Sequence, residues 1–296
     1  MPEPVPTPVF VPSSVPDPVP VSAAKSTTWY STEPPPPLVV QGFGWLRVAL
    51  RGGALALIVY GGLIVLLLAR LLERPLFGQR RPVTPFITQA ACRAALMALG
   101  LRLRVQGKPM QLPGALVANH ASWLDIFALN AAQQGYFVAK SEVAGWPGIG
   151  WLARATGTLF IARKVQAAGE QKRTFEARLR MGHRLLFFPE GTSSDGRRVL
   201  PFKSTLFAAF FAPELRDVLH IQPVSVVYSA PEGTDPRLYG WWGDMGFAAH
   251  MLVVLGAARR GQVALTFHPP RPVSGFADRK ALAKYCQATV QGGCGF

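Results

Sequence analysis

"ALVANHASWLDIF", residues 115–127, combines a short apolar run, a polar break and a second apolar pattern. The run ALVA is typical of a buried strand, which would end at Asn119 and His120. Ser122, followed three residues later by Asp125, is typical of the start of a helix. The stretch therefore predicts a strand that leads into a helix through a short loop, with His120 and Asp125 on either side of that junction.

After residue 100 the same alternation of short apolar runs and helical patterns continues to the C-terminus. The runs that predict strands are 101–105, 115–119, 135–139, 157–162, 184–188, 221–228 and 263–267. The patterns that predict helices are 122–133, 165–181, 203–212 and 276–290. This alternation indicates an α/β fold with a mixed, largely buried sheet flanked by helices. Folds of this class place their sites where strands end in polar motifs.

The first 100 residues have a different composition. Residues 1–40 contain 12 of the 27 prolines, which predicts a disordered, proline-rich tail. Residues 41–100 predict membrane-associated helices, because residues 52–69 carry no charge and would extend about 27 Å as a helix. A buried core helix is the alternative, but the four glycines of this run are tolerated better in lipid. Residues 84–100 are a second apolar stretch, expected to lie at the membrane interface.

The chain is basic, with 31 Lys and Arg against 16 Asp and Glu and a formal net charge of +15. That balance favours an anionic membrane or an acidic carrier protein as partner. It does not indicate nucleic acid, because the basic residues are scattered and no DNA- or RNA-binding signature is present. The arginines around the apolar run predict a main domain that faces the cytoplasm. Those arginines are Arg47 and Arg51 before the run, and Arg70, Arg74, Arg80 and Arg81 after it.

His120 and Asp125 allow two interpretations. In the first, Asp125 only stabilises the start of a helix and His120 is a satisfied residue at a strand end. In the second, the imidazole folds over the first helical turn, and the carboxylate fixes its tautomer and stabilises the imidazolium. The pair would then be a general base for a side-chain nucleophile, a water or a substrate hydroxyl. Ser122 is a poor nucleophile if it caps the helix, and the other histidines form no metal-ligand spacing with His120.

Two further motifs come at predicted strand ends. In FFPEGTSSDG, residues 187–196, a glycine, free N–H groups and hydroxyls could hold a polar head group, although an ordinary turn has the same composition. In GTLFIAR, residues 157–163, the strand ends at Arg163, which suits an anion or a carbonyl oxygen. Taken alone, Arg163 is better explained as a solvated charge.

The order NHASWLD, GTLFIAR, FPEGTSS and IQPVSVVY, together with the apolar stretches at 52–100, resembles the 1-acyl-glycerol-3-phosphate acyltransferase family. The resemblance covers residues 115–228 and makes residues 101–296 the expected acyltransferase domain. It implies that His120, oriented by Asp125, deprotonates a lysolipid hydroxyl, which attacks a fatty acyl thioester without a covalent enzyme intermediate. A lipid hydrolase, with His120 activating water, and a non-catalytic membrane protein are the alternatives.

The resemblance also implies roles for other residues. Arg163, Glu190, Gly191 and Thr192 match positions that bind the acceptor head group. Two further matches are Lys140, at a basic position before an amphipathic stretch, and Pro223, in a structural motif near the acyl site. No metal and no cofactor are implied, beyond acyl carrier protein or coenzyme A as the thioester donor.

Ser193 is a departure from the family pattern. Members that bind a phosphate monoester usually carry arginine after PEGT, and serine cannot supply the bidentate grip of a guanidinium. The flanking sequence is similar to bacterial lyso-ornithine lipid O-acyltransferases, whose acceptor has an amino-acid head group. The sequence thus favours lyso-ornithine lipid as acceptor, with phosphatidic acid synthesis as the alternative. The resemblance places the enzyme at the bacterial inner membrane with acyl carrier protein as the favoured donor.

Overall fold

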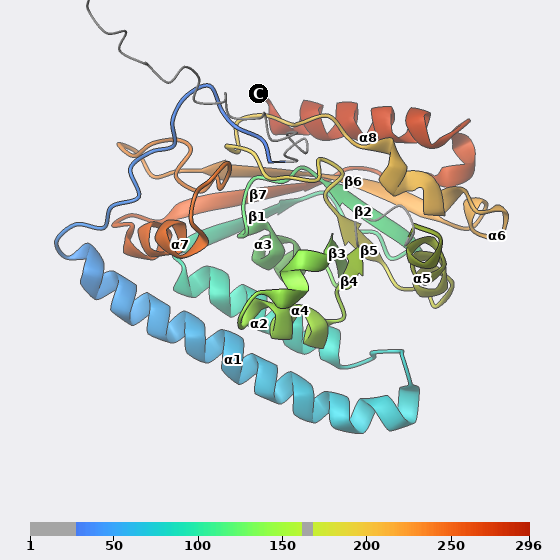
Figure 1. Ribbon diagram of the computed structural model, residues 1–296, viewed down its shortest axis with the longest axis horizontal. Coiled ribbons are helices and arrows are strands. Elements are labelled where there is room, and N and C mark those ends of the chain that lie inside the picture. The colour runs from blue at the N-terminus through green and yellow to red at the C-terminus, as the bar shows by residue number, and fades with distance from the viewer. Residues whose placement is uncertain (1–27, 162–167) are drawn as a thin grey trace, which may run out of the picture.

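The computed structural model describes residues 28–161 and 168–296, and Figure 1 shows its arrangement. A sheet crosses the centre of the molecule, with helix α8 on one face and helices α2, α3 and α7 on the other. Helix α1 lies outermost, beyond α2. Residues 1–27 of the tail expected at 1–40, and the expected head-group residue Arg163, lie outside the described residues.

The sheet is mixed, as the sequence predicted. Its strands are β1 Leu101–Gln106, β2 Gly114–Ala118, β3 Tyr136–Lys140, β4 Leu159–Ile161, β5 Leu185–Phe187, β6 His220–Ser229, β7 Gly261–Phe267 and β8 Arg271–Pro272. The order is β1-β7-β6-β2-β5-β3-β4, with β8 paired to β6. Strand β6 is antiparallel to β7 and β8, and the other neighbouring pairs are parallel. The parallel strands β2, β5 and β3 therefore end at one common edge.

The helices are α1 Gly44–Phe77, α2 Thr84–Ala98, α3 Asp125–Ala132, α4 Ile149–Thr156, α5 Ala168–Arg180, α6 Pro213–Arg216, α7 Phe247–Gly256 and α8 Arg279–Cys294. Short 3-10 helices cover Ser141–Gly145, Ser204–Phe211 and Val273–Gly275. The expected helix at 203–212 is thus of the 3-10 type. Helices α4 and α7 were not predicted from the sequence.

Strand β2 is the centre of the core, and all of its residues are buried. Because strand side chains alternate between faces, Leu116 packs in the cluster beside α2 and α3, whereas Val117 packs in the cluster beside α8. A strand buried on both faces reads as a continuous apolar run, which is the pattern of GALVA. The buried sheet fixes the position of the loop that follows β2.

Helix α1 is long and apolar enough to cross a membrane, with a mean hydropathy of 2.5 over its best 18-residue window. Only 11% of that window is buried against the rest of the protein. Its amino end is tied to the domain, because Arg47 donates to Gly256 O at 2.9 Å and Arg51 donates to Ala257 O at 2.8 Å. Near its other end, Glu73 accepts from the N–H of Val83 at 2.7 Å. Helix α1 is therefore held to the domain near both ends, while much of its apolar side stays exposed.

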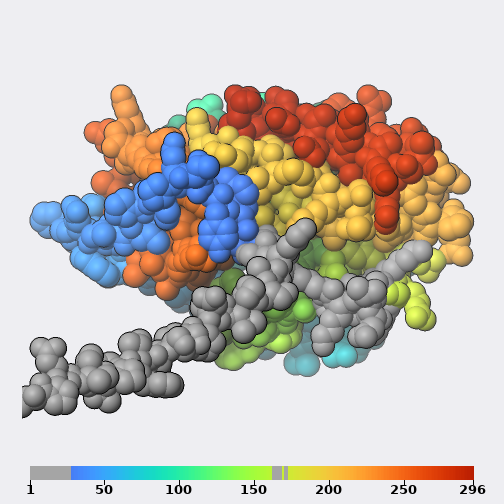
Figure 2. Space-filling model, turned by 45° about the horizontal axis from the view of Figure 1, so that its top comes forward, coloured from blue at the N-terminus to red at the C-terminus, as the bar shows by residue number. Residues whose placement is uncertain are grey.

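Residues 28–43, most of which we expected in the disordered tail, lie along the domain surface, where Figure 2 shows them in blue. Tyr30 donates its hydroxyl proton to Asp244 at 2.9 Å, and Glu33 forms an ion pair with Arg237 at 3.1 Å. Arg198 lies over the ring of Trp29, with 4.9 Å between the guanidinium carbon and the ring centre. These contacts bring the segment next to the PEGTSS loop.

Candidate active site

The structure brings His120 and Asp125 into contact. His120 lies two residues beyond β2, and Asp125 is the first residue of α3. The loop between them turns back, so that Nδ1 of His120 is 2.7 Å from Oδ2 of Asp125. Because His120 precedes the helix, a separation of five residues does not place the two side chains on different helical faces.

Asp125 is fully buried and accepts hydrogen bonds through both carboxylate oxygens. Oδ2 also accepts from the backbone N–H groups of Ala121 and Ser122, at 2.9 and 3.1 Å. Oδ1 accepts from the hydroxyl of Tyr228 at 2.8 Å. The helix-start role and the histidine-orienting role that we weighed as alternatives are thus filled by the same carboxylate. The Ser122 hydroxyl, by contrast, does not cap the helix. Its Oγ is buried and has no hydrogen-bond partner among the described residues.

Tyr228 comes from strand β6 and is a site residue that sequence analysis missed. It is buried, and burial, followed by the adjacent Asp125 carboxylate, raises its pKa well above the usual value. The phenol therefore stays protonated and acts as a donor to Asp125. The sequence held one signal: Val224, Val226 and Tyr228 share a strand face, and a buried tyrosine on such a face needs a partner for its hydroxyl.

The imidazole of His120 is held on its flat side as well. It stacks on Phe188, with 4.0 Å between ring centres and 9° between ring planes. Asn119, directly before it, is fixed by a pair of hydrogen bonds to the backbone of Val226, at 2.8 and 2.9 Å. The His120 side chain is still 19% exposed. The ring is therefore fixed in orientation, with Nδ1 engaged and with part of the side chain open to a substrate.

Glu190, from the PEGTSS loop, lies beside this pair. Its Oε1 accepts from the backbone N–H of His120 at 3.2 Å, and its Oε2 has no partner in the described part of the chain. Burial, with a smaller contribution from the charge of Asp125, raises the pKa of Glu190 to about 9. At neutral pH the carboxyl is therefore protonated, and the Asp125 carboxylate has no second negative charge next to it.

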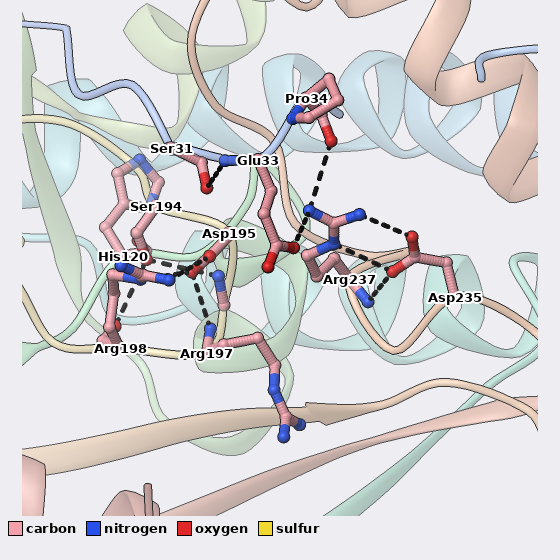
Figure 3. A network of polar contacts seen from close by, with 11 residues as sticks. Ser31, Glu33, Pro34, His120, Ser194, Asp195, Arg197, Arg198, Asp235 and Arg237 are labelled. Atoms are coloured by element: carbon pink, nitrogen blue, oxygen red, sulfur yellow. Dashed lines mark hydrogen bonds and ion pairs between the residues drawn. The ribbon is translucent and has the colours of Figure 1, made fainter. Parts of the chain in front are cut away.

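The rest of the PEGTSS loop is tied to His120 and to the N-terminal segment. Ser194 N–H donates to His120 O at 2.9 Å, and Asp195 pairs with Arg198 at 3.0 Å, in the network that Figure 3 shows. Thr192 Oγ1 accepts from Trp29 N–H at 3.4 Å. Gly191 has a φ of +71°, a conformation that glycine adopts without strain. The loop conformation that positions Glu190 therefore depends on a glycine at 191.

The other expected site residues lie on neighbouring strands. Lys140 is the half-buried last residue of β3, at the same sheet edge as His120. Pro223 is buried in β6 and lies opposite Val117 of β2, and its carbonyl accepts from His268 N–H at 3.0 Å. Pro223 thus belongs to the sheet beneath the site. Ser193, where phosphate-binding members carry arginine, is buried in the loop.

Comparison with known proteins agrees with this architecture. The family model described as Acyltransferase matches residues 102–227. The lyso-ornithine lipid O-acyltransferase of Rhodobacter capsulatus is 58% identical over 269 residues, which is 90% of this chain and 97% of that protein. The enzyme of the same name from Rhizobium meliloti is 37% identical and matches 81% of this chain and 83% of its own length.

A solved structure has the same fold. The 1-acyl-sn-glycerophosphate acyltransferase of Thermotoga maritima superposes with a TM-score of 0.59 at 24% identity, over 84% of this chain and 94% of that one. At that identity the likeness concerns the fold alone. The identity to the Rhodobacter protein over nearly its whole length is what decides the family. The chain belongs to the acyltransferase family and, as an enzyme, transfers acyl groups to lysolipids.

Proposed function

We propose that this enzyme acylates the hydroxyl of lyso-ornithine lipid, with His120 as general base and acyl carrier protein as donor of the fatty acyl group. The contact between His120 Nδ1 and Asp125 Oδ2, at 2.7 Å, is the observation that carries the mechanism. The names of the Rhodobacter and Rhizobium relatives, together with Ser193, support the acceptor.

The proposed reaction is one direct transfer. Nε2 of His120 takes the proton of the lysolipid hydroxyl as the oxygen attacks the thioester carbonyl. The C–O bond forms, the C–S bond breaks, and the proton passes from the imidazolium to the departing thiolate. Asp125 stabilises the imidazolium meanwhile, and the Tyr228 hydroxyl and two backbone N–H groups hold that carboxylate in place.

Glu190 has a supporting role in this proposal. Because its carboxyl is protonated at neutral pH, it can donate a hydrogen bond to an oxygen of the acceptor head group. Thr192, Gly191, Lys140 and Arg163 complete the proposed acceptor site. A neutral carboxyl and a serine at 193 suit an acceptor without a phosphate monoester better than lysophosphatidate, which needs charge-assisted donors.

The donor and the membrane side are proposed from charge. Acyl carrier protein is acidic, and a chain with a net charge of +15 attracts it. The excess of arginine after residue 69 supports a domain on the cytoplasmic side of a bacterial inner membrane. Coenzyme A thioesters are the alternative donor, and no cofactor takes part.

A competition assay tests the acceptor. The purified full chain is given lyso-ornithine lipid and lysophosphatidate in equal amounts with one acyl carrier protein thioester, and both diacylated products are quantified. We expect the ornithine lipid product to dominate. Dominant phosphatidic acid would overturn the proposed acceptor, and release of free fatty acid without acceptor would indicate a hydrolase instead.

1-Acyl-sn-glycerol-3-phosphate acylation remains the second candidate because of one comparison. The Neisseria gonorrhoeae enzyme of that name is 42% identical over 118 residues. That match covers 39% of this chain and 46% of the Neisseria protein, so it supports shared chemistry more than a shared acceptor.

A further inference from the structure

A cavity with several arginines in its lining is found at the opposite edge of the sheet from His120. It has a volume of about 440 Å³, and Arg80, Arg81, Tyr136, His183 and Arg184 are among the residues that line it. Tyr136 opens strand β3 and Arg184 directly precedes β5, so both lie at the amino ends of these strands. His120 follows the carboxyl end of β2, and β2 runs parallel to β5. The cavity is therefore separate from the acyl-transfer site.

Arginines surround this cavity without matching carboxylates. Arg81 and Arg178 bond to backbone carbonyls at the end of α4, Ala155 O at 2.5 Å and Gly157 O at 3.0 Å. Arg178 also lies over the Tyr136 ring, with 4.7 Å between its guanidinium carbon and the ring centre. Among the described residues, no carboxylate lies within ion-pair distance of Arg80, Arg81, Arg178 or Arg184.

Glu73 is an acidic residue that interacts with this cluster, and its carboxylate is already engaged. It pairs with Arg70 at 3.2 Å and accepts from the N–H of Val83 at 2.7 Å and from the hydroxyl of Thr84 at 2.9 Å. One carboxylate thus opposes Arg70 and the four other arginines. Four of these five arginines are partly buried, Arg80 being the exposed one. Like charges in such excess repel one another, and a bound anion would relieve that repulsion.

His183, which also lines the cavity, is a second indication that a ligand is missing there. It is 7% exposed, and neither ring nitrogen has a partner in the part of the chain that the structure describes. Burial, followed by the charges of Arg178, Arg81 and Arg70, lowers its pKa to about 4. At neutral pH the ring is therefore uncharged, with one N–H free to donate. A buried polar group without a partner is uncommon and needs an explanation, such as an absent ligand.

The position of the cavity identifies the anion's source. Phe77, the last residue of α1, lines it, and the last turns of α1 expose Leu71, Leu72 and Leu76. An apolar helix that ends among arginines places those arginines at the depth of lipid head groups. We propose that this cavity binds the phosphate group of an anionic phospholipid, whose acyl chains lie along the exposed side of α1. The proposal is independent of which lysolipid the enzyme acylates.

Thermal unfolding of the full chain in a neutral detergent tests this site. The probes are dioctanoyl phosphatidylglycerol, dioctanoyl phosphatidylcholine and inorganic phosphate at one ionic strength. At about 100 times its dissociation constant, phosphatidylglycerol should raise the Tm by about 5 °C. Phosphatidylcholine should have little effect. Equal protection by inorganic phosphate would show a free-anion site and overturn the lipid assignment.

The variant pair R80Q/R184Q removes two cavity arginines, and R102Q/R104Q removes two exposed arginines of β1 as a matched control. We expect the phosphatidylglycerol shift to fall to under half in the first pair and to persist in the control. R80Q alone, on an exposed side chain, serves if the first pair does not fold. An unchanged shift in the cavity variants, or an equal loss in the control, would refute the site.

Discussion

The two edges of the sheet differ in how completely their polar groups are paired. At the carboxyl edge, Asp125 accepts from His120, Tyr228 and two backbone N–H groups. At the amino edge, arginines outnumber carboxylates and both ring nitrogens of His183 lack partners among the described residues. The four hydrogen bonds to Asp125 fix a catalytic geometry before substrate binds, whereas a deficit of anions leaves a place that a ligand can fill.

The contributions of the two edges to folding stability should change with pH in opposite directions. Glu190 has its pKa raised from 4.5 to about 9, so it stabilises the fold fully at acid pH and loses that contribution as pH rises from 4.5 to 9. His183 has its pKa lowered from 6.5 to about 4, so its contribution is complete above 6.5 and is lost as pH falls toward 4. The edges thus respond to opposite ends of the pH range.

The largest effect should come from removing the proposed general base at the carboxyl edge of the sheet. H120A removes the proton acceptor, and we expect the acyl transfer rate to fall by about 10³-fold. H220A is the matched control, because His220 opens β6 at the opposite edge of the sheet. Steady-state product formation, with membrane association and Tm measured for both, checks this. Near-normal turnover of H120A would remove His120 from the mechanism.

Tyr228→Phe sharpens the comparison by removing one donor from Asp125. We expect kcat to fall about tenfold with little change in KM, because the substitution leaves Oδ1 unpaired and the imidazole less well oriented. The same change should cost about 1–3 kcal/mol of stability. A loss of stability with unchanged kcat would reduce Tyr228 to a structural residue.

The pH response is the third effect. We expect the Tm of wild type to decline between pH 6.5 and 9 as Glu190 ionises, with a loss of unfolding free energy of at most ~1.4 kcal/mol per pH unit. E190Q mimics the protonated carboxyl, so this decline should become shallower. H183Q should instead make the decline in Tm toward acid pH shallower. Thermal unfolding from pH 4 to 9 measures both. Parallel curves for wild type and E190Q would mean that Glu190 is ionised in the folded protein.

The smallest effect should come from Ser193→Arg. An added guanidinium should raise the use of lysophosphatidate relative to lyso-ornithine lipid by about tenfold or less, since one bidentate contact contributes little more than 1 kcal/mol after desolvation. S204R, at the start of the 3-10 helix that follows the loop, controls for added charge. If both variants leave the acceptor ratio unchanged, residue 193 does not select the head group.

The sequence predicted what local patterns determine. The strand-to-helix junction at 115–127 was predictable, because a strand buried on both faces and the start of a helix each have their own sequence pattern. The hydrogen bond from Tyr228 to Asp125 could not be predicted, since it joins residues 103 positions apart and depends on the register of β6 beside β2. Helices α4 and α7 were missed because each follows a glycine and has no acidic residue in its first turn, whereas α3, which is as short as α4, begins at Asp125.

For a related reason, the sequence did not predict that residues 28–40 lie along the domain surface. A proline-rich composition predicts that a segment cannot form a core of its own. It does not predict whether the segment packs on the surface of the folded domain. Trp29, Tyr30 and Glu33 each find a partner more than 160 residues away in the sequence. Such contacts follow only once the PEGTSS loop and the loop after β6 have been placed.

A double-mutant cycle between His120 and Asp125 tests the central claim most directly. Acyl transfer is measured for wild type, D125N, H120A and the double variant under identical conditions. If Asp125 acts through the imidazole, D125N alone should slow transfer by about 10²-fold, yet add nothing once His120 is gone. Losses that multiply in the double variant would show that the two side chains act separately, and would contradict a base made of this pair.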